Sequence, residues 1–132
     1  MLRHLLRVRI SLPIDSHLKA IVAAVGRQPV TLLRATPGAG KTTRVPPALL
    51  SLKVAGRIVV LEPRRVAAKF AAVRVAEELG TELGGRVGYQ FRFEKKLTDR
   101  TEIVFLTEGL FLRWLAGNPT LTGIGIVVLD EF

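Results

Sequence analysis

A glycine-rich turn between an apolar segment and a helix constrains the fold of this chain more than any other feature. Residues 30–35 have the apolar pattern of a short strand, and the turn Thr-Pro-Gly-Ala-Gly follows them directly. Gly38 and Gly40 permit positive φ and close approach of the backbone to a ligand. The stretch Ala35-Thr-Pro-Gly-Ala-Gly-Lys-Thr42 matches the phosphate-binding pattern G-x-x-x-x-G-K-[ST] at every fixed place but the first, where Ala35 stands.

The residue types of this loop suit a nucleoside triphosphate bound with Mg²⁺. Backbone N–H groups of the turn would surround the β-phosphate, and the helix that starts at Lys41 adds its positive end. Lys41 would contact the β- and γ-phosphates, the Thr42 hydroxyl would bind Mg²⁺, and Thr43 would reach the α-phosphate. The candidate phosphate-binding residues are Pro37, Gly38, Ala39, Gly40, Lys41, Thr42 and Thr43.

The rest of the chain alternates helical and strand-like segments with short connections, which predicts an α/β fold with a parallel sheet flanked by helices. The predicted helices cover residues 14–25, 41–51, 63–80 and 109–116, and the predicted strands cover 30–35, 57–62, 87–92, 102–107 and 124–129. The third helix places Val66, Phe70 and Val73 on one apolar face. The alternating aromatic residues near position 90, which are Tyr89, Phe91 and Phe93, are interpreted as core and edge packing, and Trp114 as core.

Two carboxylates end the last apolar segment, where they would complete a nucleotide site. In a parallel sheet, ligands bind at the carboxyl ends of the strands. Asp130 would hold Mg²⁺ through a water molecule, and Glu131 would contact the metal and orient or deprotonate the attacking water. Glu131 and Lys41 are therefore the candidate catalytic residues. Taken alone, an Asp-Glu pair after a strand is also typical of a solvated turn.

The basic residues are concentrated in the first half of the chain, since residues 1–61 hold Asp15 as their sole acid and ten lysines and arginines. This imbalance indicates a polyanionic partner or, more simply, a solvated basic face. Residues 1–11 form a basic N-terminal extension. The absence of cysteine excludes a disulfide-stapled scaffold. No apolar run reaches the ~18 residues that a membrane span needs, and we expect a cytoplasmic protein.

Several further motifs lie in order between the loop and the acidic pair. They are Glu62-Pro-Arg-Arg-Val-Ala-Ala68, Arg74-Val-Ala-Glu-Glu78, Gly88-Tyr-Gln-Phe-Arg-Phe-Glu94 and Thr107-Glu-Gly109. Together with Asp130-Glu131, they resemble the DEAH-box branch of superfamily 2 ATP-dependent helicases, most closely the bacterial HrpB-type branch. Phe132 stands where the family name has alanine. The resemblance covers residues 12–132.

The resemblance implies a RecA-like P-loop NTPase domain that binds ATP and Mg²⁺ on one face and nucleic acid on another. Arg74 matches the residue that stacks on the adenine base. Arg64 and Arg65 match the motif that contacts the RNA backbone, and Thr107 and Gly109 match a phosphate-contacting motif. Arg92 is a further candidate for nucleic-acid contact. The resemblance leaves open whether the partner is RNA or DNA.

The resemblance also implies that residues 12–132 form an incomplete first RecA-like domain, truncated after the Walker B strand. The second RecA-like domain and its arginine fingers would be missing, so we expect this chain alone not to unwind nucleic acid. A strand beyond Phe132 would insert between the Walker A strand and the Asp130 strand, and its absence would leave a gap in the sheet. Two alternatives stay open: a basic nucleic-acid-binding module with a vestigial loop, and another P-loop enzyme such as a small-molecule kinase.

Overall fold

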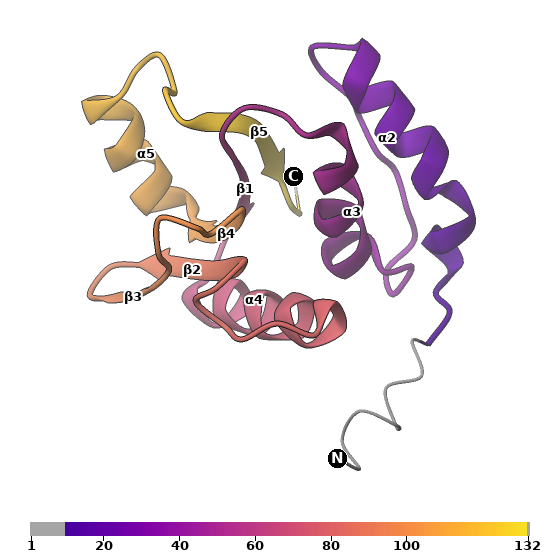
Figure 1. Ribbon diagram of the computed structural model, residues 1–132, viewed down its shortest axis with the longest axis horizontal. Helices are drawn as coiled ribbons and strands as arrows, with labels where there is room; N and C mark the ends of the chain where they lie inside the picture. Colours follow the sequence, from indigo (N-terminus) through magenta and orange to yellow (C-terminus); the bar gives the residue numbers. More distant parts are fainter. Residues whose placement is uncertain (1–9, 132) are drawn as a thin grey trace.

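A mixed sheet of five strands forms the centre of the computed structural model, which describes residues 10–131 (Figure 1). The order of the strands is β3-β2-β4-β1-β5. The bounds are β1 Arg57–Glu62, β2 Val87–Phe91, β3 Glu94–Lys96, β4 Ile103–Thr107 and β5 Ile124–Leu129. β2, β4, β1 and β5 run parallel to one another, and β3 is antiparallel to β2. Most of the N-terminal extension, residues 1–9, and Phe132 lie outside the described residues.

Helices cover both faces of the sheet, with α5 on one side and α3 and α4 on the other (Figure 1). The helical bounds are η1 Pro13–His17, α2 Leu18–Arg27, α3 Lys41–Leu49, η2 Leu50–Leu52, α4 Arg65–Leu79 and α5 Glu108–Gly117. The α/β fold predicted from the sequence is therefore confirmed. The first predicted helix divides into the 3-10 turn η1 and α2, and the second ends in the 3-10 turn η2.

The central strands bury side chains on both faces, as their continuous apolar sequences predict. Ile58, Val60, Ile103 and Phe105 pack in the cluster that includes residues of α3 and α4. Their alternate neighbours Val59, Leu61, Val104 and Leu106 pack against the α5 residues Leu110, Phe111 and Trp114. The parallel pairing of β1 with β4 on one side and with β5 on the other places the carboxyl ends of these three strands beside one another.

The predicted apolar face of the third helix is wrong. Val66 and Phe70 are exposed on α4, which begins at Arg65 rather than at Pro63. The buried positions are instead Ala68, Ala71, Ala72, Val75 and Ala76, which follow the helical period. Small side chains on this face let the helix lie close to the sheet, so the larger apolar residues point outward.

The predicted strand at residues 30–35 is also wrong, because the segment pairs with no strand in the described part of the chain. Val30 and Leu32 are exposed. A cavity separates this segment from β5, and both segments line it. Backbone that has the composition of a strand becomes one only when a neighbouring strand is within hydrogen-bonding distance, which explains the difference.

The aromatic segment forms a hairpin that the sequence did not predict. β2 ends at Phe91, so Arg92 lies in the turn, and the chain returns as β3. Tyr89 is buried as predicted, but Phe93 is 92% exposed and adopts a φ of 69°. Its side chain lies beside the Arg92 guanidinium, 4.8 Å from the ring centre, instead of packing in the core.

The helices of residues 10–131 lack the combination of length and apolar character that a membrane crossing requires.

Candidate functional site

The carboxyl ends of three adjacent parallel strands bring the predicted site residues together. Glu62 at the end of β1 is in register with Thr107 at the end of β4. On the other side of β1, the Asp130 amide donates to the Leu61 carbonyl at 3.1 Å. The residues that follow these strands therefore share one edge of the sheet, which is where ligands bind in open α/β folds.

The glycine-rich loop has the backbone conformation that its sequence predicts. Gly38 and Gly40 have φ values of 81° and 98°, in the left-handed region. A side chain at Gly40 would also collide with Leu12, because a Cβ there would lie 2.5 Å from Leu12 Cδ1. Gly40 is the N-cap of α3, and its carbonyl accepts the Arg44 amide at 2.9 Å. The loop thus opens directly into the first turn of the helix.

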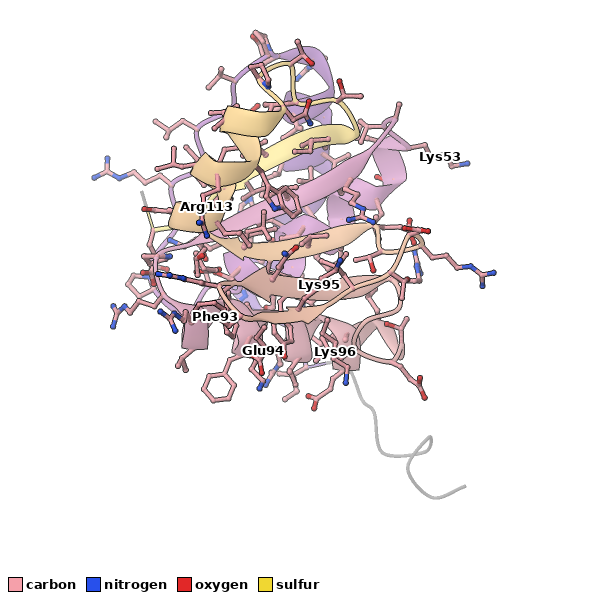
Figure 2. The ribbon with its side chains drawn as sticks, turned by 90° about the vertical axis from the view of Figure 1, so that its left-hand side faces the viewer. Lys53, Phe93, Glu94, Lys95, Lys96 and Arg113 are labelled. Carbon is pink, nitrogen blue, oxygen red and sulfur yellow. The ribbon has the colours of Figure 1, made fainter. Side chains whose placement is uncertain are left out.

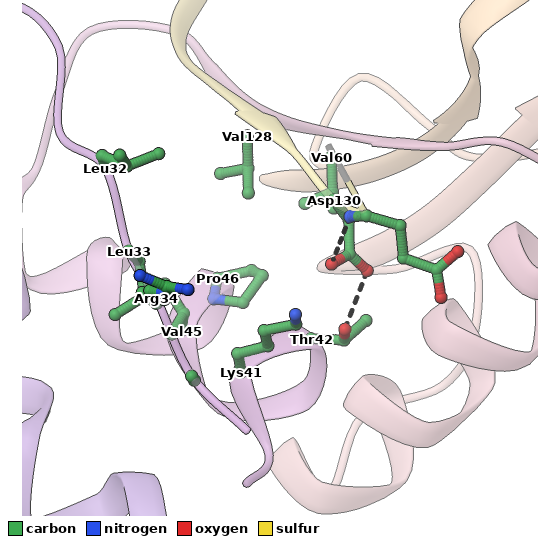
Figure 3. Close-up of a pocket in the computed structure, with 12 residues that line it drawn as sticks. Leu32, Leu33, Arg34, Lys41, Thr42, Val45, Pro46, Val60, Val128 and Asp130 are labelled. Carbon is green, nitrogen blue, oxygen red and sulfur yellow. Dashed lines mark hydrogen bonds between the residues drawn. The ribbon is translucent and has the colours of Figure 1, made fainter. Parts of the chain in front are cut away.

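A direct contact joins the phosphate loop to the acidic pair at the end of β5. The Thr42 hydroxyl donates to Asp130 Oδ2 at 2.7 Å, although 88 residues separate the two. Lys41, Thr42, Asp130 and Glu131 all line one cavity of about 460 Å³. Figure 3 shows Lys41 and Thr42 rising from the start of α3 toward Asp130, with Val128 and Leu32 across the cavity. The structure therefore brings together the predicted catalytic and metal-binding residues.

Asp130 is held on both carboxylate oxygens. Its Oδ1 accepts the Glu131 amide at 3.0 Å, and its Oδ2 accepts the Thr42 hydroxyl. Glu131 is exposed and has a φ of 55°. This conformation is uncommon for a residue other than glycine, and Glu131 lies two residues beyond the end of β5.

Glu62 is a buried acid that the sequence analysis assigned no role. Its side chain is 3% exposed, and within residues 10–131 no hydrogen-bond partner reaches its Oε1 atom. Burial, and after it the neighbouring Asp130 and Glu131 carboxylates, together raise the pKa of the Glu62 carboxyl to about 8. Its position at the end of a buried strand, where a charged residue is unusual, is the one sequence signal that pointed to it.

Some predicted nucleotide-binding residues do not line the cavity. Arg74 lies on α4 with a side chain that is 56% exposed, and its Nε donates to Glu78 Oε1 at 3.3 Å. The remaining loop residues that do not line it are Pro37, Gly38, Ala39, Gly40 and Thr43. They form the turn just before Lys41 and the first turn of α3, where Thr43 Oγ1 donates to the Gly40 carbonyl at 3.4 Å.

The five predicted nucleic-acid-binding residues line a second cavity of about 540 Å³. They are Arg64, Arg65, Arg92, Thr107 and Gly109, and they come from the start of α4, the β2–β3 turn and the start of α5. Thr107 is the N-cap of α5, but its hydroxyl makes no capping hydrogen bond, so it can contact a ligand. Among the described residues, this lining includes no acid.

Arg113 is a lining residue that the sequence analysis missed. It adds a fourth guanidinium to this cavity. It lies on the same side of the molecule as the β2–β3 turn, where Phe93 is labelled (Figure 2). Its spacing of four residues from Gly109 on a helix would have predicted this position. A cavity with four arginines and a free hydroxyl is suited to a polyanion.

Comparisons with known proteins agree with this geometry. No protein-family model matches the chain. A probable ATP-dependent RNA helicase of Saccharomyces cerevisiae, DHR2, is 41% identical over 131 residues, which cover 96% of this chain and 18% of that protein. The ATP-dependent RNA helicase HrpB of Escherichia coli is 41% identical over 123 residues, covering 92% of this chain and 15% of that protein. DHX30 of Gallus gallus, also an ATP-dependent RNA helicase, is 42% identical over 127 residues, covering 91% of this chain and 10% of its own length.

A solved structure shows that the likeness extends to the fold. The crystal structure of the Escherichia coli DEAH/RHA helicase HrpB superimposes with a TM-score of 0.87 at 41% identity, covering 92% of this chain and 16% of that one. The chain thus spans less than a fifth of the length of each of these relatives. By sequence and by fold, this chain is a relative of the DEAH-box ATP-dependent RNA helicases and matches one RecA-like segment of them.

Proposed function

We propose that this chain is the ATP-binding portion of a DEAH-type RNA helicase, with Mg-ATP at the first cavity and RNA at the second. The observation that carries the proposal is the 2.7 Å hydrogen bond from Thr42 to Asp130. It joins the end of the phosphate loop to the acid of the second motif, as a site for a metal-bound triphosphate requires.

The residues present fit a Mg²⁺-triphosphate group. Thr42 and Asp130 offer hydroxyl and carboxylate oxygens, the donors that Mg²⁺ prefers. In the described part of the chain, no group of three or more acids or histidines is arranged to hold a metal alone. This agrees with a metal whose other ligands are phosphate oxygens and water. When bound, Mg²⁺ would neutralise charge on the phosphates and polarise them toward attack by water.

The chain's own residues then have separate tasks. The backbone N–H groups of residues 38–42 and the positive end of α3 surround the phosphates, and Lys41 adds an ammonium group. Asp130, fixed on both oxygens, orients the metal. Glu131, exposed at the cavity, orients or deprotonates the attacking water. Arg74 covers the adenine base from α4.

On the second surface, Arg64, Arg65, Arg92 and Arg113 neutralise the RNA backbone, while the Thr107 hydroxyl and the Gly109 amide hydrogen-bond to phosphate. Because Glu62 and Thr107 are paired in register, the two cavities lie at neighbouring strand ends. This arrangement would allow nucleotide and RNA to influence each other. The chain spans less than a fifth of the length of these relatives, and the proposal for this segment is the binding of Mg-ATP and RNA.

Titration with a fluorescent ATP analogue and Mg²⁺ tests the nucleotide site. Lys41→Ala should abolish saturable binding because it removes the charge that faces the β- and γ-phosphates. Lys53→Ala, which removes an exposed lysine at the end of η2, is the matched control and should bind like the wild type. Equal binding by the wild type and Lys41→Ala would refute the proposed site.

RNA binding at several salt concentrations tests the second surface. Arg64→Ala should weaken binding and lower the slope of log K against log salt by about one phosphate contact. Arg100→Ala removes an exposed arginine before the opposite end of β4 and should leave the slope nearly unchanged. RNA binding that ignores both nucleotide and Lys41→Ala would favour a basic module with a vestigial loop. Nucleotide binding without any RNA affinity would favour another P-loop enzyme.

A further inference from the structure

A buried arginine lies one turn into the helix that follows the phosphate loop. Arg44 is 3% exposed, and its NH1 atom donates to both carboxylate oxygens of Asp15, at 2.8 and 2.6 Å. Its Nε donates to Glu78 Oε2 at 2.9 Å, and its NH2 donates to the carbonyl of Ile10. A guanidinium with so little contact with water needs these acidic partners, because an uncompensated buried charge is strongly destabilising.

Glu78 connects this buried charge to an exposed one. Its Oε2 accepts Arg44, while its Oε1 accepts Arg74 Nε at 3.3 Å. Glu78 is 17% exposed, whereas the Arg74 side chain is 56% exposed. The carboxylate is therefore fixed from the buried side and presents its other oxygen to the surface arginine. Two acids and two arginines compensate one another across the network.

The same network is attached to the phosphate loop at two points. The Arg44 amide donates to the carbonyl of Gly40, which places Arg44 in the first turn of α3. On the other side, Asp15 Oδ2 accepts the Leu12 amide at 2.9 Å, and the neighbouring Ile14 amide donates to the Ala39 carbonyl at 3.1 Å. Arg44 and Asp15 are thus both linked to the phosphate loop by backbone hydrogen bonds.

We propose that Glu78 is a positioning residue for the base of the nucleotide, because it fixes Arg74 relative to the phosphate loop through Arg44. The inference rests on the proposed function, in which Arg74 contacts the base and the loop binds the phosphates. A free arginine side chain loses rotamer entropy when it is ordered. Glu78 restricts this freedom before the nucleotide arrives, which lowers the cost of ordering Arg74 on the base.

The test compares two ligands that share phosphates and differ in the base, Mg-ATP and Mg-tripolyphosphate. Glu78→Gln keeps the shape of the side chain but removes the charge that holds Arg74, and it leaves Asp15 as the acid that compensates Arg44. We expect the Kd for Mg-ATP to rise about two- to fivefold, in line with an exposed ion pair. The Kd for Mg-tripolyphosphate should stay within about twofold of the wild-type value. Glu82→Gln removes the same charge from an exposed glutamate just beyond the end of α4 and is the matched control.

A double-mutant cycle separates positioning from a general structural effect. In an Arg74→Ala background, Glu78→Gln should no longer change the ratio of the two Kd values, because its effect passes through Arg74. A change in ratio that persists in this background overturns the proposal. An equal loss of affinity for both ligands overturns it too, since that would mean a damaged loop.

Two further outcomes distinguish this proposal from the function on which it rests. If the wild type binds neither ligand, the proposed function fails and the role of Glu78 fails with it. If it binds both equally well, the phosphate site stands and the positioning role is overturned. NMR relaxation of the Arg74 Nε–H group in the wild type requires no variant to fold. We expect an ordered side chain, and motion equal to that of the exposed loop residue Arg100 would refute the inference.

Discussion

Because the Glu62 carboxyl is buried, we predict that the free energy of unfolding of this chain falls as the pH rises. Its pKa is raised from 4.5 to about 8, chiefly by burial and then by Asp130 and Glu131. In the unfolded chain the carboxyl ionises near its ordinary value. Between these two pH values the folded chain retains a proton that the unfolded chain has released. The contribution to stability is therefore fully present below pH 4.5 and is lost as the pH rises through about 8.

The size of the effect follows from the difference between the two pKa values. Each unit corresponds to about 1.4 kcal/mol, so the full loss from pH 4.5 to about 8 is about 5 kcal/mol. At pH 7 the loss amounts to about 3 kcal/mol. Small domains have unfolding free energies of about 5–15 kcal/mol, so this single group affects a large part of the total.

Glu62→Gln is the perturbation that isolates this group, because glutamine has the shape of the protonated acid and does not ionise. Urea unfolding between pH 4.5 and 8.5, followed by circular dichroism, gives the free energy of unfolding of both proteins. We expect the free energy of unfolding of the variant to rise relative to that of the wild type by up to about 1.4 kcal/mol per pH unit across this window. Glu102→Gln, at an exposed carboxylate paired with Arg86, is the matched control for charge loss. Parallel curves for the wild type and Glu62→Gln would refute the reasoning.

Three further substitutions test the packing by the same unfolding assay. Phe105→Ala empties a fully buried position of the central strand β4 and should cost about 3–5 kcal/mol, and a loss below 1 kcal/mol would contradict its place in the core. Gly88→Ala should cost about 1–3 kcal/mol, because the added Cβ would lie 2.3 Å from the Lys96 carbonyl oxygen. Gly109→Ala should leave stability unchanged or slightly raised, since open space surrounds that position on α5. A larger loss at Gly109 than at Gly88 would show that the β2–β3 pairing is misplaced.

The elements that the sequence predicted well are those whose formation follows from a local apolar pattern. Residues 57–62 and 124–129 were predicted as strands with the bounds that β1 and β5 have. The continuous apolar sequence of β1 fits a strand covered on both faces, and the apolar run of β5 marks a strand although β5 is only partly buried at the edge of the sheet. The phosphate loop was predictable for a related reason, since its glycines and the Lys-Thr pair act within a few residues of one another.

Elements that depend on a distant neighbour could not be predicted from pattern alone. Residues 30–35 have the composition of a strand, yet the structure places a cavity where a hydrogen-bonding neighbour would be. On α4, the burial of alanines rather than Val66 and Phe70 follows from the short distance to the sheet, which no property of the helix itself specifies. Phe93 is exposed because β2 ends at Phe91, one residue before the predicted end of the strand, and the chain turns at Arg92.

In the candidate site too, some residues could be predicted from a local motif, whereas others depend on contacts with distant segments. Lys41, Thr42 and Asp130 were predictable because phosphate and Mg²⁺ require those residue types at the end of a strand. Binding of phosphate or Mg²⁺ does not require Glu62 or Arg44. The properties of both residues come from their neighbours in the fold. Glu62 retains a proton because it is buried beside two carboxylates. Arg44 remains charged in the interior because it forms ion pairs with Asp15 and Glu78. Sequence spacing therefore predicts the groups that we propose to touch a ligand, whereas buried groups such as Glu62 and Arg44 emerge only when the fold brings distant segments into contact.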